Sequence, residues 1–489
     1  MSILVIDVGT SGVRGAVVRP DASVTDIHHV PVLPESPFPG LVEFDGTAIA
    51  TAVGDVASRS LADGGPVDAV GIANQRASTL VWDRATGEPV GPGLGWQDLR
   101  TVGTCLELQG QGIRVAPNAS ATKLAAILDT ADPDRSRSER GELAFGTIDT
   151  WVAWILSGGE LHVTDASNAG VTGLIHGDGF GWSTDLLAAL RIPEAVLPEI
   201  VDSTGIIGTA RTLAGGPPIA GMAGDQQASL IGQSCTRAGL AKATFGTGGL
   251  LDQCLGATRP HQAVRGPAGT IPIIAWRRAG TITWGIEAIM LSAGNCVEWL
   301  RDDLMIIEDA ADSATVAARC TDTGDVWFVP ALLGLGTPVW DFGARGTFTG
   351  ITRGSRRPEL VRAVLEGVAH RGADLLEAAE GDSGLPIGAL RVDGGMTSND
   401  VFTQALADAC GRPIEIAPVV EATTLGAAFL AGMAVGTWTD EDDVAAAWTP
   451  RAVIEPAGTT SEHAAARERW LDARSRAEGA VPELTGIDF

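Results

Sequence analysis

The chain has 489 residues, of which 45% are hydrophobic and 19% charged, so it is long enough for two or three domains and too hydrophobic to be disordered. Its net charge of −26, from 34 basic and 60 acidic residues, excludes an electrostatic drive toward nucleic acid or anionic lipid. A phosphate site on this chain therefore has to be local, built from backbone amides, hydroxyls, a metal ion and a few arginines.

The six cysteines show neither C-x-x-C spacing nor an accompanying histidine cluster, which argues against a zinc site or a disulfide framework. The segment MSILVIDVG at the N-terminus has no basic region and too short an apolar run for a signal peptide. No stretch of about 18 apolar residues predicts a membrane span. We therefore expect a cytoplasmic protein with no membrane partner.

The predicted elements alternate between strand and helix. In chain order they are a hairpin in the first ~20 residues (ILVID, turn GTSG, VRGAVV), a helix over 47–62, a strand over 67–73, helices over 120–129 and 143–156, a second hairpin in KATFGTGGLLDQ, and helices over 358–380 and 398–410, the last with Ser398 as N-cap. This alternation predicts an α/β fold. We place a second lobe near residue 233, which gives domains 1–232 and 233–489.

The first hairpin carries the groups that a phosphate needs. Asp7 closes its first strand, and the turn Gly9–Gly12 supplies backbone amides together with the hydroxyls of Thr10 and Ser11. Arg14 adds a full positive charge. A carboxylate at the strand end suits Mg²⁺, which keeps most of its hydration shell. The alternative is an ordinary hairpin with a polar tip.

Two further glycine turns follow apolar strands. The turn of the second hairpin includes Thr247 and Gly248 and offers the same amides and hydroxyl. The segment VDGGMTSND at 392–400 predicts a strand, a glycine turn and a helix N-terminus, which lets an anionic or flat group approach the backbone. We expect Asn399, at this helix N-terminus, to hydrogen-bond the adenosine or ribose of a nucleotide. A structural turn is the alternative in both cases, but two similar hairpins in two halves favour a common function.

Asp225 follows the apolar segment PPIAGMAG and precedes a predicted helix. A carboxylate at this point is suited to accept a proton from a substrate hydroxyl in phosphoryl transfer. The alternative, compatible with the first, is a helix cap. The chain has no G-x-x-x-x-G-K-[ST] motif and no H-R-D or D-F-G set, so it is neither a P-loop nucleotidase nor a protein kinase.

With these motifs in place, the chain resembles the FGGY carbohydrate kinases of the actin-like and sugar-kinase ATPase superfamily, from residue 3 to about 438. The segment GTFTGITRGSRRPELVRAVLE at 346–366 fits the C-terminal signature, and SATKLAAIL at 120–128 resembles the N-terminal one, with Ala126 in place of the usual tryptophan. Within the family the glycerol kinases are the nearest type. The resemblance implies two ribonuclease-H-like domains with a cleft between them, which close over ATP and a small polyol or sugar.

The resemblance also assigns roles by position. Asp225 matches the catalytic base, and Asp7 together with Asp225 matches the carboxylates near Mg²⁺. The nucleotide-contacting positions, including the turn residues above, are Thr10, Ser11, Arg14, Thr247, Gly248, Gly294, Gly395, Met396 and Asn399. The polyol-contacting positions are Arg76, Ala77, Trp96, Asn118, Asp225, Gln226 and Leu250.

Three of the polyol positions depart from the glycerol kinase pattern. Ala77 stands where a glutamate is usual, Asn118 where a tyrosine is expected, and Leu250 where an aromatic residue is expected. A lost carboxylate leaves a substrate hydroxyl without its acceptor, and smaller side chains enlarge the pocket. We therefore expect a substrate other than glycerol or larger than it, such as a tetritol, a pentitol or a ketose.

The alternatives to a polyol kinase are a xylulokinase-like ketose kinase and a catalytically silent sugar sensor on the same scaffold. A ribokinase-type enzyme lacks paired hairpins, and a nucleotide-switched chaperone or filament protein lacks the Arg76 and Trp96 pair and the 346–366 signature. The predicted ligands are ATP, Mg²⁺ and a small polyol or sugar. The sequence leaves a homodimer open.

Overall fold

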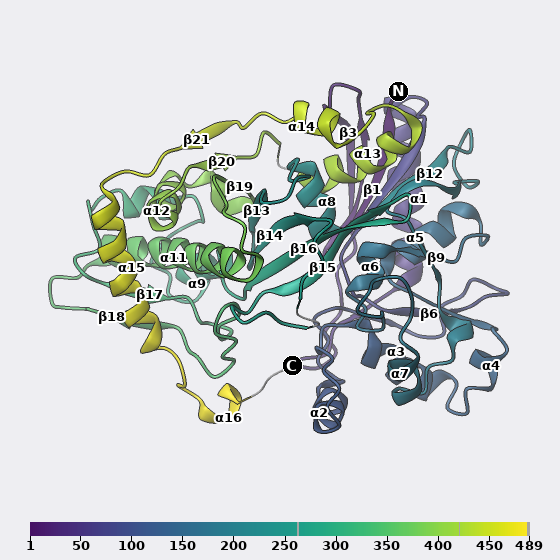
Figure 1. Ribbon diagram of the computed structural model, residues 1–489, viewed down its shortest axis with the longest axis horizontal. Helices are drawn as coiled ribbons and strands as arrows, with labels where there is room; N and C mark the ends of the chain where they lie inside the picture. Colours follow the sequence, from purple (N-terminus) through teal and green to yellow (C-terminus); the bar gives the residue numbers. More distant parts are fainter. Residues whose placement is uncertain (262–263, 420, 487–489) are drawn as a thin grey trace.

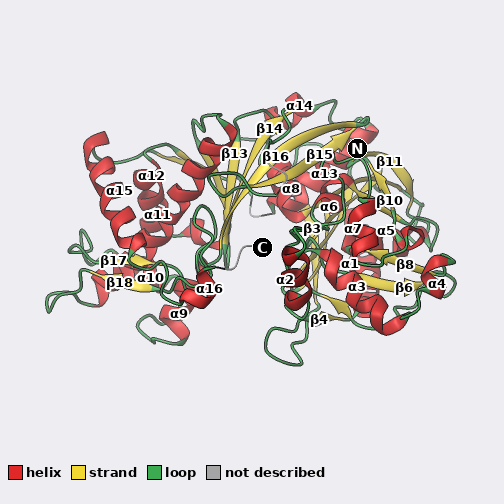
Figure 2. Ribbon diagram, turned by 60° about the horizontal axis from the view of Figure 1, so that its bottom comes forward, coloured by secondary structure: helices red, strands yellow, loops and turns green. Residues whose placement is uncertain are grey.

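The computed structural model of the chain describes residues 1–261, 264–419 and 421–486 (Figure 1). One 13-stranded sheet crosses the molecule in the order β21-β20-β19-β13-β14-β16-β15-β11-β12-β5-β1-β2-β3. Figure 2 shows the helices that follow residue 290, α13 and α14 apart, gathered on one side, with strands β13–β16 running from there to the first half of the chain. The α/β architecture predicted from the alternation of elements is confirmed.

The two halves of this sheet repeat one strand pattern. In the first half, the strands are β1 (Ile3–Gly9), β2 (Gly12–Val18), β3 (Val24–Pro31), β5 (Ala69–Asn74) and β12 (Pro218–Gly224). In the second half they are β13 (Ala241–Phe245), β14 (Gly249–Gly256), β16 (Thr281–Met290), β19 (Leu390–Asp393) and β20 (Ile414–Ile416). In each half, three neighbouring strands are antiparallel to one another. On its other side, the first of these three strands pairs in parallel with a fourth strand, and the fourth pairs in parallel with a fifth.

The halves meet at β11 (Thr204–Thr209) and β15 (Ile271–Arg278), which pair at Thr204 and Arg278. β21 (Ala452–Ile454) forms the far edge. The short strands outside the main sheet are β4 (Glu43–Phe44), β6 (Leu80–Asp83), β7 (Gly93–Leu94), β8 (Leu143–Gly146), β9 (Val163–Asp165), β10 (Glu199–Val201), β17 (Trp327–Val329) and β18 (Thr347–Thr349).

The helices before the joint are α1 (Gly46–Gly64), α2 (Val102–Gly110), α3 (Ser120–Ala131), α4 (Ser136–Glu139), α5 (Ile148–Ser157), α6 (Ala166–Gly170), α7 (Thr184–Ala189) and α8 (Asp225–Gly232). Those after it are α9 (Gly294–Asp302), α10 (Asp312–Ala317), α11 (Arg357–Ser383), α12 (Asp400–Cys410), α13 (Ala422–Val435), α14 (Glu441–Ala446), α15 (Thr460–Ser475) and α16 (Pro482–Thr485). Two 3-10 turns, Glu194–Val196 and Gly395–Ser398, complete the elements.

Strand β1 shows how the sheet is buried on both faces. Leu4 and Ile6 pack into one core with residues of α1 and α5, while Ile3 and Val5 pack into another with residues of α13. Alternate residues of a strand point to opposite faces, so an unbroken apolar run such as ILVI requires cover on both sides. Helix α13, although late in the chain, supplies that cover for the first half of the sheet.

Three predicted elements need correction. The helix expected over 143–156 is strand β8 followed by helix α5, because residues 143–146 pair with β6 as a strand. A buried apolar run of this length fits either element on periodicity alone. The N-cap of α12 is Asn399 rather than Ser398, since its side chain accepts from the amides of Val401 and Phe402, both at 3.1 Å. Helix α11 continues past residue 380 to Ser383.

Helices α8 and α13 cross with their backbones in contact, and a glycine on each makes this approach feasible. A Cβ atom built on Gly426 would overlap the carbonyl oxygen of Ala228, and one built on Gly232 would overlap that of Ala422. Backbone atoms cannot move aside as side-chain ends do. The close approach of α8 and α13 therefore depends on these glycines.

We expect Gly426→Ala to lower the free energy of unfolding by ~1–3 kcal/mol or more, because it forces α8 and α13 apart. Gly54→Ala is the matched control: Gly54 lies in α1 with open space around its Cβ position, so alanine there should be neutral or stabilising by ~0.5–1 kcal/mol. Denaturant unfolding of both variants measures the difference. Equal stabilities would show that the helices separate without cost.

Candidate active site

The first glycine turn joins β1 to β2 and carries a charged pair at its base. Asp7 and Arg14 lie opposite each other in the hairpin, and Gly9 lies opposite Gly12. Burial raises the pKa of Asp7 to about 7, the charge of Arg14 opposes this rise, and the negative charge of Asp225 adds to it. Asp7 and Asp225 are therefore close enough to repel each other, although they lie far apart in the sequence.

Sheet topology explains why these two carboxylates meet. Strands β1, β5 and β12 are parallel neighbours in which Asp7 is aligned with Ala73, and Ala73 with Ala223. The carboxyl ends of parallel strands meet at one edge of a sheet, where ligands bind in open α/β folds. Asp225 follows β12 directly, and Arg76 follows β5 by two residues.

Asp225 is the first residue of α8, with Gly224 as the N-cap. Its carboxylate accepts from the amide of Gln226 at 2.8 Å and lies 3.4 Å from Nε of Arg76. Burial raises the pKa of Asp225, and the positive charge of Arg76 opposes the rise. The side chain keeps 33% of its surface exposed, so it remains open to a ligand. It does not occupy the cap position that was the alternative to a chemical role.

Arg76 connects the two halves of the sheet. Its guanidinium contacts the carboxylate of Glu287 in β16 through Nη2 at 2.7 Å, next to the Nε that faces Asp225. Glu287 is aligned with Asp252 in β14, which is in turn aligned with Lys242 in β13. These four charged side chains are largely or fully buried. Burial raises the pKa of Glu287, and Arg76 opposes the rise.

Lys242 extends this network to a second predicted substrate residue. Its ammonium is 2.8 Å from Asp252 and donates to the carboxamide oxygen of Gln226 at 2.6 Å and to Thr244 Oγ1 at 3.1 Å. Sequence reasoning missed Lys242, Asp252 and Glu287. The sequence feature that could have indicated them is a single charged residue inside each of three mostly apolar strands, where an unpaired charge would be costly.

The other predicted substrate positions surround the loops after β5 and β7. Trp96 is 38% exposed and donates through its indole N–H to Thr10 Oγ1 at 3.2 Å, which joins the predicted substrate and phosphate positions. Ala77 is buried with a φ of 60°, a conformation that costs a non-glycine residue energy and is found at ligand sites. Asn118 is exposed, and Leu250, in β14 of the second half, lies opposite Thr244.

The second and third glycine turns lie together. The amide of Gly294 donates to Gly246 O at 2.8 Å, and the amide of Ala293 donates to Thr247 O at 3.0 Å, so the start of α9 packs on the hairpin turn. Gly394 packs against the backbone of Phe245 with no room for a side chain. The structure therefore brings together five of the predicted nucleotide positions, Thr247, Gly248, Gly294, Gly395 and Met396.

Asn399 lies in the same region but has other partners. Its carboxamide oxygen caps α12, and its Nδ2 donates to Ser313 Oγ at 3.0 Å. Within the described residues, no hydrogen bond or ion pair joins the 246–249 turn to Asp225. Asp225 and the 246–249 turn thus lie on different elements of the fold.

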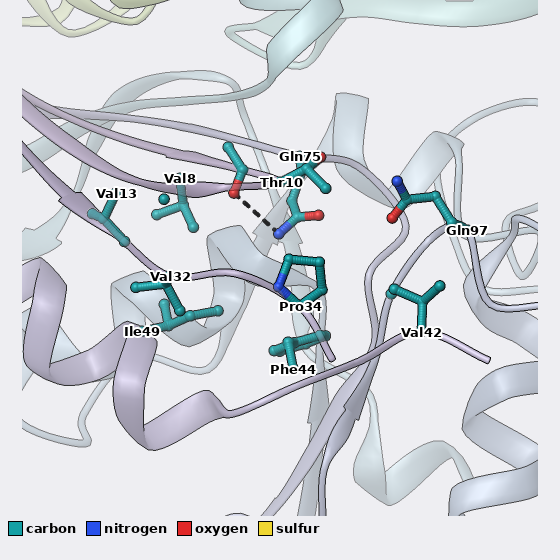
Figure 3. A pocket seen from close by; sticks show the side chains of 13 residues that line it. Val8, Thr10, Val13, Val32, Pro34, Val42, Phe44, Ile49, Gln75 and Gln97 are labelled. Carbon is teal, nitrogen blue, oxygen red and sulfur yellow. Dashed lines mark hydrogen bonds between the residues drawn. The ribbon is translucent and has the colours of Figure 1, made fainter. Parts of the chain in front are cut away.

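A small cavity lies behind the first glycine turn (Figure 3). Thr10 and Gln75 lie at one end of it, and Gln75 donates to Gly9 O at 3.3 Å. Its volume of about 10 Å³ holds one water molecule at most. A larger groove of about 530 Å³, which includes Arg84, Trp151 and Trp154 among its lining residues, contains none of the predicted site residues. Neither space is the predicted substrate site.

Asp7 and Asp225 are the candidates for binding Mg²⁺. The described residues contain no group of three or more histidine, cysteine, aspartate or glutamate side chains placed to hold a metal. A protein site for Mg²⁺ needs only one or two carboxylates, because waters and substrate phosphates supply the other ligands. The two mutually repelling carboxylates fit such an ion, since a cation between them would relieve the repulsion that raises the pKa of Asp7.

Comparison with known proteins gives the family that the sequence motifs indicated, over nearly the whole chain. Residues 2–232 match the N-terminal domain and residues 241–435 the C-terminal domain of the FGGY family of carbohydrate kinases. The chain is similar to glycerol kinase of Trichlorobacter lovleyi, with 42% identity over 98% of this chain and 99% of the relative. It is also similar to glycerol kinase 2 of Thermotoga maritima, with 40% identity over 98% and 99%.

Among solved structures, glycerol kinase of Plasmodium falciparum with ADP has a TM-score of 0.90 and 26% identity, over 100% of this chain and 99% of that one. A ligand-bound xylulose kinase of Lactobacillus acidophilus has a TM-score of 0.86 and 22% identity over 99% of each chain, which indicates a shared fold. The predicted fold class, two α/β domains of the sugar-kinase type, is confirmed. Within the described residues, no helix is both long and apolar enough to cross a membrane.

We expect Arg76→Met to lower the free energy of unfolding by ~3–5 kcal/mol, because it leaves the carboxylate of Glu287 buried without its cation. Arg76→Met/Glu287→Met should recover part of this loss. Arg59→Met is the matched control, since Arg59 pairs with Asp55 at the surface and its removal should change stability by less than ~1 kcal/mol. Chemical denaturation of the variants measures these differences. A single variant as stable as the wild type would mean that Arg76 does not support the fold.

Proposed function

Because the chain belongs to the FGGY family of carbohydrate kinases, we propose that it transfers the γ-phosphoryl group of ATP to one hydroxyl of a small polyol or sugar. The family makes the chain a phosphotransferase that acts on a carbohydrate or polyol. The proposed transfer to a hydroxyl rests on one observation above all: Asp225, Arg76 and Asp7 converge at one edge of the sheet, with the carboxylate of Asp225 partly exposed.

In this proposal the polyol binds over Trp96, with its hydroxyls held by Arg76, Asp225 and Gln226. The second half, through Thr247, Gly248, Gly294, Gly395, Met396 and Asn399, holds ATP. Closure of the halves excludes water and aligns the γ-phosphate with the hydroxyl. Asp225 accepts the proton of the attacking hydroxyl, and a carboxylate whose pKa is raised by burial is a stronger proton acceptor than an exposed one.

The charge that develops on the transferred group is met by Arg14, by the backbone amides of the two hairpin turns, and by the hydroxyls of Thr10 and Ser11. Mg²⁺, held by Asp7 and Asp225 through water, would supply neutralisation of the phosphate charge when bound. The residues of the chain then need only hold the reactants in line and move one proton.

We also propose that the substrate is larger than glycerol. Ala77, Asn118 and Leu250 are the three positions that depart from the glycerol kinase pattern. Ala77 presents a methyl group, so any hydroxyl at that point needs a different acceptor. A tetritol, a pentitol or a ketose offers hydroxyls that reach beyond these positions. A ketose kinase is thus an alternative within the same chemistry, and the fold shared with a xylulose kinase is compatible with it.

We further propose that the protein works in the cytoplasm, in keeping with its reduced cysteines. The division into domains between residues 232 and 233 also remains our proposal.

A homodimer is the assembly we propose, and light scattering of the purified protein decides between it and a monomer.

Asp225→Asn should lower kcat by ~10²- to 10⁴-fold, because the amide cannot accept the hydroxyl proton. The Kd for ADP should stay within ~2-fold, since five of the predicted nucleotide residues, from Thr247 to Met396, lie on the other half. Coupled detection of ADP release and calorimetric titration with ADP give the two values. Asp63→Asn, at an exposed pair with His28, is the control and should leave both unchanged. More than a few per cent of wild-type activity in the Asp225→Asn variant would exclude the role of general base.

Initial rates with glycerol, erythritol, xylitol and D-xylulose test the substrate proposal. We expect kcat/KM for at least one of the three larger compounds to exceed that for glycerol by ~10-fold or more, because an unmatched hydroxyl acceptor costs about this factor. A clear preference for glycerol would refute the enlarged pocket while leaving the kinase assignment intact. No ADP release with any sugar or polyol would instead support the silent sensor.

A further inference from the structure

The chain contains only two lysines, Lys123 and Lys242, and both are fully buried. Lys242 belongs to the charged network beneath Arg76. Lys123 is in the first turn of α3, where the helix dipole disfavours a positive charge. A buried cation at this position costs energy in two ways, so its contacts have to compensate.

Those contacts are backbone carbonyl oxygens of the predicted substrate pocket. The ammonium of Lys123 donates to Pro117 O and Asn118 O, each at 2.9 Å, and to Trp96 O and Ala119 O, each at 3.3 Å. A lysine has three N–H donors, so these four acceptors take all of them. The side chain therefore ties the segment that carries Trp96 to the segment that carries Asn118.

The neighbouring residue Ser120, at the start of α3, completes the arrangement. Ser120 donates through its hydroxyl to Ala77 O at 3.0 Å. Ser78, next to Ala77, accepts from the amide of Trp96 at 3.1 Å. The start of α3 thus holds the backbone at three of the seven predicted polyol positions, Ala77, Trp96 and Asn118, without itself being among those positions.

We propose that Lys123 is a positioning residue for polyol binding, which fixes the pocket wall formed by Trp96 and Asn118. The inference rests on the proposed function, because it takes these residues as the substrate wall. Without the ammonium, four carbonyl oxygens lose a charged donor and the two segments can move apart. The effect falls first on the polyol, because, in the part of the chain that the structure describes, Lys123 donates to none of the predicted nucleotide residues and reaches Thr10 only through Trp96.

Titration of Lys123 gives a readout that a passive core residue lacks. Burial lowers the pKa of Lys123 to about 8 from its ordinary 10.5, and the negative charge of Asp98 opposes this. Besides Asp98, the ionisable group that faces it is Cys105 of α2, and Asp98 is itself paired with Arg100. Above pH ~8 the neutral amine has two N–H donors and a lone pair that repels carbonyl oxygens, so the hold on the pocket weakens.

The effect on stability has the opposite sign. Because the pKa is lower in the folded state, the unfolded chain binds more protons between pH 8 and 10.5, and this group makes the fold more stable as pH rises through that range. Weaker polyol binding at alkaline pH would therefore not come from unfolding through Lys123.

The test compares Lys123→Met with Leu128→Ala, a fully buried position at the other end of α3. With the best polyol of the panel, we expect Lys123→Met to raise the KM for polyol by ~10-fold or more and to change the KM for ATP by less than ~2-fold. Leu128→Ala should lower Tm at least as much and leave both KM values unchanged. An unchanged polyol KM in Lys123→Met, or equal rises in both variants, would overturn the proposal.

The dependence of the polyol KM on pH tests the role of Lys123 even if Lys123→Met does not fold. In the wild type, the polyol KM should rise between pH 8 and 9.5, above the titration of Asp7, while in Lys123→Arg, whose cation does not titrate there, it should stay flat. A flat wild-type profile would overturn the proposal. If the wild type turns over no polyol, the proposed function fails separately, and calorimetric titration of xylitol into wild type and Lys123→Met then measures the role of Lys123 in binding.

Discussion

The site depends on a buried guanidinium that pairs with two carboxylates. Arg76 contacts Asp225, which begins α8, and Glu287, which belongs to a strand of the second half. Asp252 and Lys242 extend the group, so three carboxylates share two cations. Burial raises the pKa values of Asp225 and Glu287, the positive charge of Arg76 opposes both rises, and the negative charge of Asp252 adds to them. Burial beside this network thus makes Asp225 a better proton acceptor than an exposed carboxylate, while Arg76 limits the shift.

The repeated strand pattern explains why the sequence alone revealed so much. Each half begins with a hairpin whose turn needs glycine, and an apolar run on either side of a glycine turn is visible without any structure. Because the parallel strands that follow end at the same edge, a polar residue after each of them is a candidate site residue. Asp7, Arg76 and Asp225 were all predicted on that basis or on the family resemblance, and the structure brings them together.

The rest could not be predicted, because it depends on pairing between distant segments. Lys242, Asp252 and Glu287 lie side by side only once β13, β14 and β16 are in register, and no local pattern fixes that register. The role of Lys123 depends likewise on the loops that fold over α3. The prediction of a helix over 143–156 was wrong for a related reason: residues 143–146 form a strand because they pair with the distant strand β6.

The contacts between the halves limit how they can move. Strands β11 and β15 pair at one position, which leaves little resistance to twisting there. Helices α8 and α13, by contrast, meet backbone to backbone, and α13 also covers the strands of the first half. Separating them would expose the apolar surface that they share, so α8 and α13 move as one body with that sheet. In the closure proposed above, the second half would rotate about this body, and Arg76, paired with Asp225 in α8 and with Glu287 in the second half, would hold the two together.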